Sequence, residues 1–311
     1  MKLSQSNGPL FHFYNGDLHS TLVHLKNAGF KYIDLSFWSR YTTPDSPYFT
    51  TDNQIIADEY KRELEALELI PVQSHEPVGN FFSDDEKERE IYFVKTPLSI
   101  DLAGKIGIPS ITLHAGFESV LMSREEYMTK SAEVFRGLIP YAEKYGTKLL
   151  IENTGWKVDG VHLSTADDLN ELLDRIDHPL FGVCWDTGHA NLCDLNQYDE
   201  LMKFGPRLQG MHIHDNFGGK QTPNCDLHQY PFYGNVNFDA VIQALLDLGY
   251  QGTFNFEVDS PVWRSVIPFV KDGKEQRKLR KMPAALRQKA EMYLFEIGKQ
   301  MLEAYDCFEE N

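Results

Sequence analysis

Three consecutive stretches in the middle of the chain decide the fold: LLIENT at residues 149–154, TADDLNELLDRI at 165–176 and FGVCWD at 181–186. The outer two are short, largely apolar runs of the kind that form buried strands. The middle stretch has apolar residues at helical spacing. Strand, helix and strand in this order are typical of a βαβ unit, in which the two strands run parallel. The fold class therefore depends on how often this unit repeats.

The same alternation runs through the whole chain. Strands are expected at residues 2–6, 32–37, 69–75, 110–115, 149–154, 181–186, 208–214 and 253–258. Helices are expected at 17–29, 54–68, 88–107, 124–146, 165–176, 238–249 and 284–305, and four of them end in glycines that suit left-handed C-caps: Gly29, Gly107, Gly146 and Gly249.

This pattern predicts an α/β protein with a single (β/α)₈ TIM barrel over residues 1–311 and a C-terminal helical extension from about 262 to 311. An open doubly wound sheet is the alternative, but the sequence contains neither a G-x-G-x-x-G motif nor a P-loop to support it.

Composition limits the classes of function. The 311 residues include 30 basic and 46 acidic side chains, which give a formal net charge of −16. This acidity disfavours nucleic acid as a partner, because affinity for phosphate backbones comes from Lys and Arg. No apolar run is long enough for a membrane span, and the N-terminal sequence does not resemble a signal peptide. Four cysteines without C-x-x-C spacing add no disulfide or zinc-ribbon pattern, so we expect a cytoplasmic protein.

Histidines and carboxylates stand at the ends of most of the expected strands. They are His75, His114, Glu152, Asp186, His212, His214 and Glu257; His189 comes three residues after Asp186, and His228 follows in a later loop. In a (β/α)₈ barrel the active site lies at the C-terminal ends of the strands. Imidazoles and carboxylates that meet there are ligands for a divalent cation with open positions for a substrate. The other five histidines, His12, His19, His24, His162 and His178, are expected on the surface or in loops.

Three motifs at these positions resemble those of the xylose isomerase-like barrel superfamily. They are IENTG around Glu152, GVCWDTGHANL around Asp186 and His189, and GMHIHDN around His212. The superfamily includes sugar-phosphate isomerases and epimerases, ketose 3-epimerases, inosose-processing enzymes and abasic-site nucleases of the endonuclease IV type. The resemblance runs from the third strand to the eighth. It implies that Glu152, Asp186, His212 and Glu257 bind one divalent cation. Mn²⁺ or Mg²⁺ is expected before Zn²⁺ or Co²⁺, because three carboxylates and one imidazole form a hard site.

The resemblance also implies a reaction. The expected enzyme is a metal-dependent isomerase or epimerase of a sugar, sugar phosphate or sugar acid. It would act through a metal-stabilised cis-enediolate, with Glu152 and Glu257 as acid and base. The expected substrate-binding residues are His75, His114, His189, His214, Asp226, His228, Trp38 and Trp156. His214 departs from the family pattern, in which small polar residues or Lys are common; it can reach the substrate or bond Asp215.

Two other functions stay open. In endonuclease IV-like proteins the positions that match His75, His114, His189, Asp226 and His228 bind two further zinc ions, which keeps a tri-zinc abasic-site nuclease as an alternative. The other alternative is a metal-dependent subunit that cleaves C-glycosides together with a small second subunit. Residues 264–289 contain nine basic and two acidic side chains. This basic segment fits a solvated face, a contact with a second subunit or another copy of the chain, or a clamp for a phosphorylated sugar.

Overall fold

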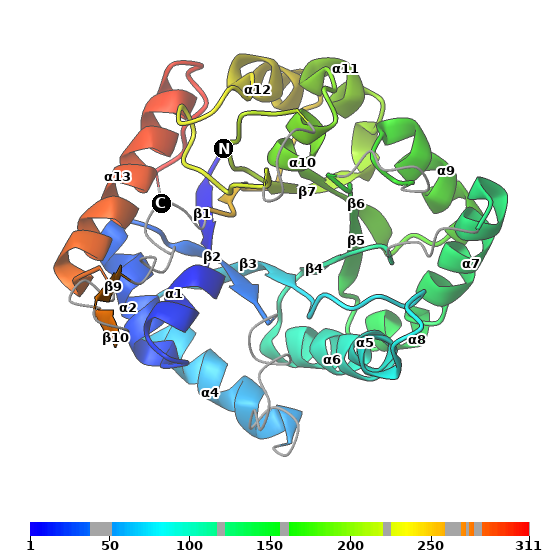
Figure 1. Cartoon of the computed structure of the whole chain (residues 1–311), viewed down its shortest axis with the longest axis horizontal. Helices are drawn as coiled ribbons and strands as arrows, with labels where there is room; N and C mark the ends of the chain where they lie inside the picture. The colour runs from blue at the N-terminus through cyan, green and yellow to red at the C-terminus, as the bar shows by residue number, and fades with distance from the viewer. Residues whose placement is uncertain are drawn as a thin grey trace.

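Eight parallel strands form the wall of a barrel, and helices surround it (Figure 1). The computed structural model describes residues 1–37, 52–116, 122–155, 162–219, 225–258, 269–271, 274–276 and 282–310. The strands are β1 Leu3–Ser6, β2 Tyr32–Ser36, β3 Ile70–His75, β4 Ser110–Leu113, β5 Lys148–Glu152, β6 Phe181–Asp186, β7 Leu208–His212 and β8 Phe254–Phe256. They are hydrogen-bonded in sequence order, β8 pairs with β1, and a parallel bridge between Ile213 and Phe256 joins β7 to β8. The predicted (β/α)₈ barrel is confirmed.

The helices largely follow the predicted pattern. They are α1 Gly8–Phe13, α2 Leu18–Ala28, α4 Asn53–Ala66, α5 Glu86–Glu90, α6 Thr96–Ile106, α7 Arg124–Arg136, α8 Ile139–Glu143, α9 Ala166–Ile176, α10 Thr187–Leu192, α11 Gln197–Met202, α12 Phe238–Asp247 and α13 Ala284–Glu303. All four glycines expected at helix ends have positive φ. The βαβ unit of β5, α9 and β6 is present. Its helix, α9, begins with a capping box between Thr165 and Asp168 and packs its apolar face on the barrel.

Two predicted helices differ from expectation. The stretch 88–107 contains a π-helical turn, Ile91–Lys95, between α5 and α6. The stretch 124–146 is divided into α7 and α8, which are separated by Gly137 and Leu138. The physical reason for the division is Pro140 in the first turn of α8, because proline lacks the N–H that a continuous helix would need.

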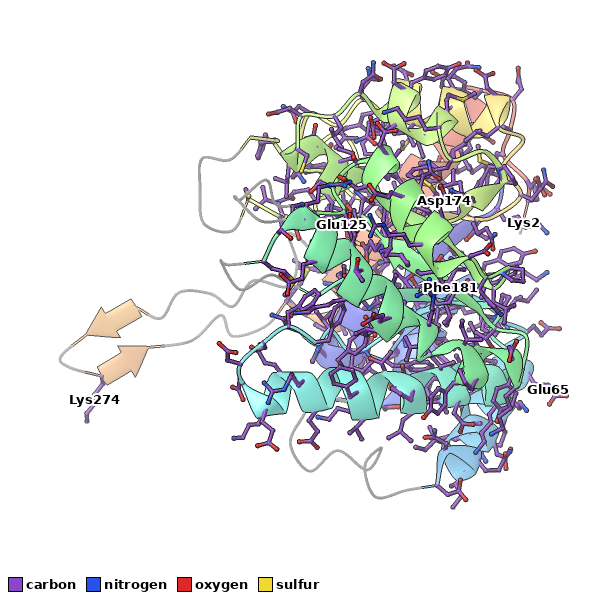
Figure 2. The ribbon with its side chains drawn as sticks, turned by 90° about the vertical axis from the view of Figure 1, so that its right-hand side faces the viewer. Lys2, Glu65, Glu125, Asp174, Phe181 and Lys274 are labelled. Carbon is purple, nitrogen blue, oxygen red and sulfur yellow. The ribbon has the colours of Figure 1, made fainter. Side chains whose placement is uncertain are left out.

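The chain after β8 returns to the barrel through α13. This helix packs on α2 and β1, and Gly298 lies so close to the wall that a Cβ there would be 2.6 Å from the Phe256 ring. Before it, β9 Phe269–Lys271 and β10 Lys274–Gln276 form an antiparallel hairpin that projects from the barrel, with Lys274 exposed (Figure 2). The C-terminal helical extension that the sequence suggests from about residue 262 stays a prediction. Within the described residues, no helix combines the length and apolarity needed to cross a lipid bilayer.

Candidate active site

The ends of the strands surround one cavity of about 380 Å³. Five of the predicted substrate-binding residues line it: His75, His114, His189, Asp226 and His228. Glu257 also lines the cavity, whereas Glu152, Asp186 and His212 are buried beneath its lining. The lining also includes the start of α1, and Ser6 and Ser36 at the ends of β1 and β2.

The four predicted metal ligands lie together. Glu152 ends β5, Asp186 ends β6, His212 ends β7 and Glu257 follows β8, and one ligand atom from each lies within 4.8 Å of the others. His212 Nδ1 is 2.9 Å from Glu152 Oε1, 3.2 Å from Glu257 Oε2 and 4.0 Å from Asp186 Oδ2. Among the described residues, no Lys or Arg forms an ion pair with these carboxylates. Three carboxylates that gather around one imidazole without a basic side chain fit a divalent cation.

Neighbouring histidines keep the Glu152 and Asp186 carboxylates ionised. Burial opposes ionisation, but the charge of His212 holds the pKa of Glu152 well below its usual range. Against the same effect of burial, His189 and His214 lower the pKa of Asp186. Both residues are therefore anionic, which is the state that a metal ligand requires.

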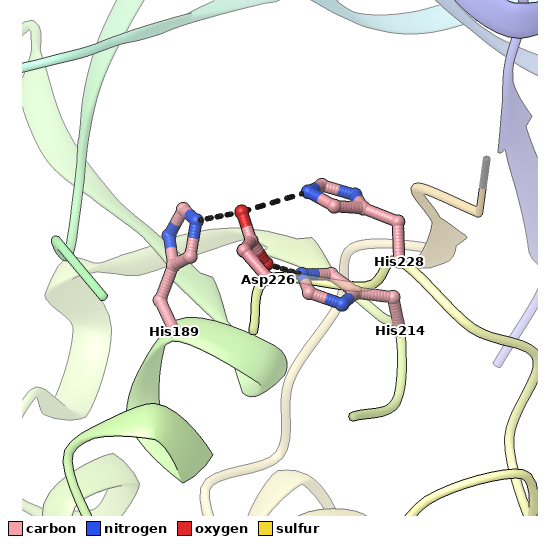
Figure 3. A group of neighbouring side chains, drawn as sticks. All are labelled: His189, His214, Asp226 and His228. Atoms are coloured by element: carbon pink, nitrogen blue, oxygen red, sulfur yellow. Dashed lines mark hydrogen bonds and ion pairs between the residues drawn. The ribbon is translucent and has the colours of Figure 1, made fainter. Parts of the chain in front are cut away.

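A second group lies beside the first. In Figure 3 the Asp226 carboxylate is placed between His189, His214 and His228. Its Oδ2 is 3.1 Å from His228 Nε2 and 3.4 Å from His189 Nε2, while Oδ1 is 3.9 Å from His214 Nε2. Burial opposes charge here too, but Asp226 raises the pKa of His228 to about 10. The group thus carries paired charges at the cavity wall.

A pair of histidines approaches Glu152 from the other side. His114 Nε2 is 3.2 Å and His75 Nε2 is 3.6 Å from Glu152 Oε2, and the two rings lie 4.7 Å apart. Burial lowers the pKa of His114 to about 4, so that this ring is neutral. Glu152 therefore connects the metal-ligand group to the two imidazoles that line the cavity.

His214 does not line the cavity. Its side chain is fully buried, its Nε2 is 3.0 Å from the Asp186 carboxylate, and its ring stacks on His228 at 3.9 Å. Asp215 has other partners, since it accepts hydrogen bonds from the backbone N–H groups of Gly234 and Val236. The expected bond of His214 to Asp215 is therefore replaced by one to Asp186, which the sequence order does not suggest.

Trp38 and Trp156 lie outside the described residues, as does much of the basic segment 264–289. The prediction for His24 was wrong: it is 2% exposed, because it lies on the inner face of α2, where its Nδ1 is 2.7 Å from the Tyr14 hydroxyl. His12 was also misplaced, since it lines the cavity on α1. The Gly8-Pro9 pair, typical of a helix start, was the signal for α1.

A closed (β/α)₈ barrel with carboxylates and imidazoles at the C-terminal ends of its strands has the architecture of barrel enzymes. Residues 22–288 match the family of xylose isomerase-like TIM barrels, and the chain belongs to this family.

Relatives and solved structures agree with this assignment. The chain is 28% identical over 193 residues to the uncharacterised protein y4fM of Sinorhizobium fredii, covering 60% of this chain and 58% of that one, which is less than two thirds of its length. It is 26% identical over 122 residues to a D-psicose 3-epimerase of Enterocloster bolteae, covering 36% and 37% of the two chains.

Two solved structures share the fold over nearly the whole chain. A D-tagatose 3-epimerase-like protein has a TM-score of 0.71 at 22% identity and 98% coverage of both chains. The IolI protein with a bound zinc atom has a TM-score of 0.72 at 18% identity, covering 98% and 99% of the two chains.

Proposed function

We propose that the protein is a metal-dependent isomerase or epimerase of a sugar, sugar phosphate or sugar acid. The observation that carries this proposal is the position of two glutamates, Glu152 and Glu257, within 3.2 Å of His212 Nδ1, from strands separated by β6 and β7. The names of the relatives support it, since they include a D-psicose 3-epimerase and a D-tagatose 3-epimerase-like protein.

The candidate metal ligands and the two glutamates have separate roles in the proposed reaction. A divalent cation bound by Glu152, Asp186, His212 and Glu257 would polarise a substrate carbonyl and make the neighbouring C–H more acidic. Glu257 is about one-fifth exposed and lines the cavity, so it can take that proton directly. Glu152 is buried and anionic, so the proton that it returns from the other side would first have to reach it from the cavity, to which His75 and His114 connect it. Return of the proton to the opposite face of the same carbon gives an epimer, and its return to the neighbouring carbon gives an isomer.

The second group of side chains, around Asp226, binds the substrate away from the reacting carbon. His189 and His228 line the cavity, and Asp226 holds them in place. Imidazole N–H groups donate to sugar hydroxyls, and the Asp226 carboxylate accepts from them. Trp38 and Trp156 are proposed to stack on the sugar.

The cation is proposed to be Mn²⁺ or Mg²⁺, since three of its four ligands are carboxylates. Zn²⁺ and Co²⁺ also suit the site, and the zinc atom of the IolI structure supports zinc as an alternative. The test is 3-epimer or isomer formation from a panel of ketoses, aldoses and their phosphates by chelator-treated protein, with and without added Mn²⁺. Cation-dependent turnover of one sugar is expected. No turnover of any sugar with any of these cations would overturn the proposal.

One observation favours a second candidate, the tri-zinc abasic-site nuclease. Eight of the nine residues that match its ligands, all except His114, belong to three neighbouring groups that also include His214, and two of these groups share Glu152 and His212. Three zinc ions per purified chain and cleavage of an abasic DNA duplex would support it. The net charge of −16 opposes it, because such a nuclease must follow phosphates. The C-glycoside-cleaving subunit, a small partner or second copy of the chain, and the cytoplasmic location stay predictions.

A further inference from the structure

The interior of the barrel beneath the cavity contains a column of polar side chains, although barrel interiors are usually filled by branched apolar ones. Asp34 of β2 is fully buried, and among the described residues its ion-pair partner is a histidine and not a Lys or Arg. Asn255 Nδ2 donates to Asp34 Oδ2 at 2.8 Å, and Ser4 Oγ donates to Asn255 Oδ1 at 2.8 Å. Gln73 Nε2 donates to the same Asp34 oxygen at 3.4 Å. A buried carboxylate destabilises a fold unless it is well bonded, so packing alone does not account for this column.

The column ends on the far side of a candidate metal ligand. His212 Nδ1 faces Glu152 and Glu257, while Nε2 of the same ring faces away from them. Gln73 Nε2 is 2.9 Å from His212 Nε2, and Asp34 Oδ2 is 3.7 Å from it. Asp34 and Gln73 pair in register between β2 and β3, which explains why both reach the ring at one level.

Hydrogen-bond chemistry decides what this contact can do. An amide nitrogen only donates, so with Gln73 Nε2 against His212 Nε2 a neutral His212 ring has its proton on Nδ1, which donates to Glu152 Oε1 at 2.9 Å. His212 can offer an Nδ1 lone pair to a cation only when its proton lies on Nε2. A half-turn of the Gln73 amide brings Oε1 against Nε2, where it accepts a hydrogen bond from that N–H, and gives up the 3.4 Å bond from Gln73 Nε2 to Asp34. The two amide orientations therefore match the two tautomers of His212.

We propose that Gln73 is a positioning residue that sets the tautomer of His212, with its amide oxygen turned toward Nε2–H when His212 binds a cation. This inference rests on the proposed function, because it takes His212 as a metal ligand. With the amide oxygen against Nε2–H, His212 keeps its Nδ1 lone pair directed at the space between Glu152 and Glu257. Without Gln73 that orientation loses its hydrogen bond, and cation affinity falls.

The test measures cation binding and needs no substrate. The full chain is stripped with a chelator and titrated with Mn²⁺ in competition with a chromogenic chelator; the visible absorption of bound Co²⁺ reports ligand geometry. Gln73→Met keeps the length of the side chain and removes its polar atoms, and it is expected to weaken Mn²⁺ binding by about 10- to 100-fold and to alter the Co²⁺ spectrum. Gln73→Asn keeps the amide but is too short to reach Nε2, and the same loss is expected.

A double variant provides the rescue. Asp34→Asn with Gln73→Glu moves the carboxylate one place along the column, so that the glutamate accepts from His212 Nε2–H while the new amide at position 34 bonds Asn255. It is expected to recover most of the affinity. The matched control is Gln5→Met on β1, because Gln5 is also fully buried and its amide atoms have no hydrogen-bond partner among the described residues. This control should bind Mn²⁺ like the wild type.

The outcomes separate the two proposals. A wild-type chain that binds neither Mn²⁺ nor Co²⁺ would overturn the proposed function and this inference with it. If the wild type binds and Gln73→Met or Gln73→Asn binds equally well with an unchanged Co²⁺ spectrum, the positioning role is wrong and the proposed function stands. If Gln73→Met does not fold, Gln73→Asn and the double variant decide by the same criteria.

Discussion

Gly188 and His214 fit together only because Gly188 has no side chain: a Cβ there would lie 1.9 Å from Cε1 of the His214 ring. Gly188 belongs to α10, whose N-cap is Asp186, and the His214 ring bonds the Asp186 carboxylate. The glycine, the histidine and the start of the helix therefore position one candidate metal ligand as a unit.

Adding a methyl group at this contact should disturb that ligand. Gly188→Ala is expected to push the His214 ring away from Asp186, to destabilise the fold by about 1–3 kcal/mol and to weaken Mn²⁺ binding about tenfold or more. His214→Ser in the Gly188→Ala background makes room for the methyl group and should restore stability. Urea denaturation and Mn²⁺ titration of the wild type, single and double variants measure both effects. Unchanged cation affinity in Gly188→Ala would show that His214 does not position Asp186.

A buried carboxyl group beside the site should make stability depend on pH. Glu76 accepts hydrogen bonds of 2.6 Å from the His114 backbone N–H and from the Thr96 hydroxyl, and burial raises its pKa from 4.5 to about 8. As pH rises between these values, the unfolded chain releases a proton that the folded chain keeps. The contribution of Glu76 is therefore full below the unfolded pKa and is lost toward pH 8, by up to about 1.4 kcal/mol per pH unit.

Glu76→Gln removes this titration. Its free energy of unfolding relative to the wild type is expected to rise between about pH 5 and pH 8 and then to level off. Urea denaturation of both proteins without added cation across this range measures the difference. The same difference at every pH would mean that Glu76 ionises alike in the folded and unfolded chains.

Cation binding should stabilise the fold, because the ligands come together only in the folded barrel. Mn²⁺ at about 100 times its dissociation constant is expected to raise the free energy of unfolding by about 2.7 kcal/mol, and a chelator should reverse the gain. Asp186→Asn should remove most of it. Asp239→Asn on α12, on the outer helical layer, is the matched control and should keep it. A gain of equal size in both variants would contradict binding at Asp186.

The barrel could be predicted because its signals are local. Strand periodicity, helical periodicity and glycines such as Gly29 and Gly107 act within one element, and all of them are readable along the chain. The π-helical turn at Ile91–Lys95 and the short helix α1 were missed, because neither changes the apolar pattern enough to be distinguished from its surroundings.

The candidate site was predictable only in part, for a related reason. The topology alone brings strand ends such as Glu152, Asp186 and His212 together. The contacts of Gln73 with His212 and of Gly188 with His214 depend on side-chain directions between separate elements, which no spacing in the sequence encodes. His24 was misassigned for the same reason, since its burial depends on which face of α2 meets the barrel.

The central claim is that Glu257 removes a proton from the carbon next to a sugar carbonyl. Its most direct test is deuterium incorporation from D₂O into a turned-over sugar by Mn²⁺-loaded enzyme, followed by NMR. We expect deuterium at that carbon with the wild type and with Glu296→Gln, an exposed glutamate on α13. Glu257→Gln should incorporate it at least about 100-fold more slowly. Turnover without solvent deuterium at that carbon, or undiminished incorporation by Glu257→Gln, would contradict the claim.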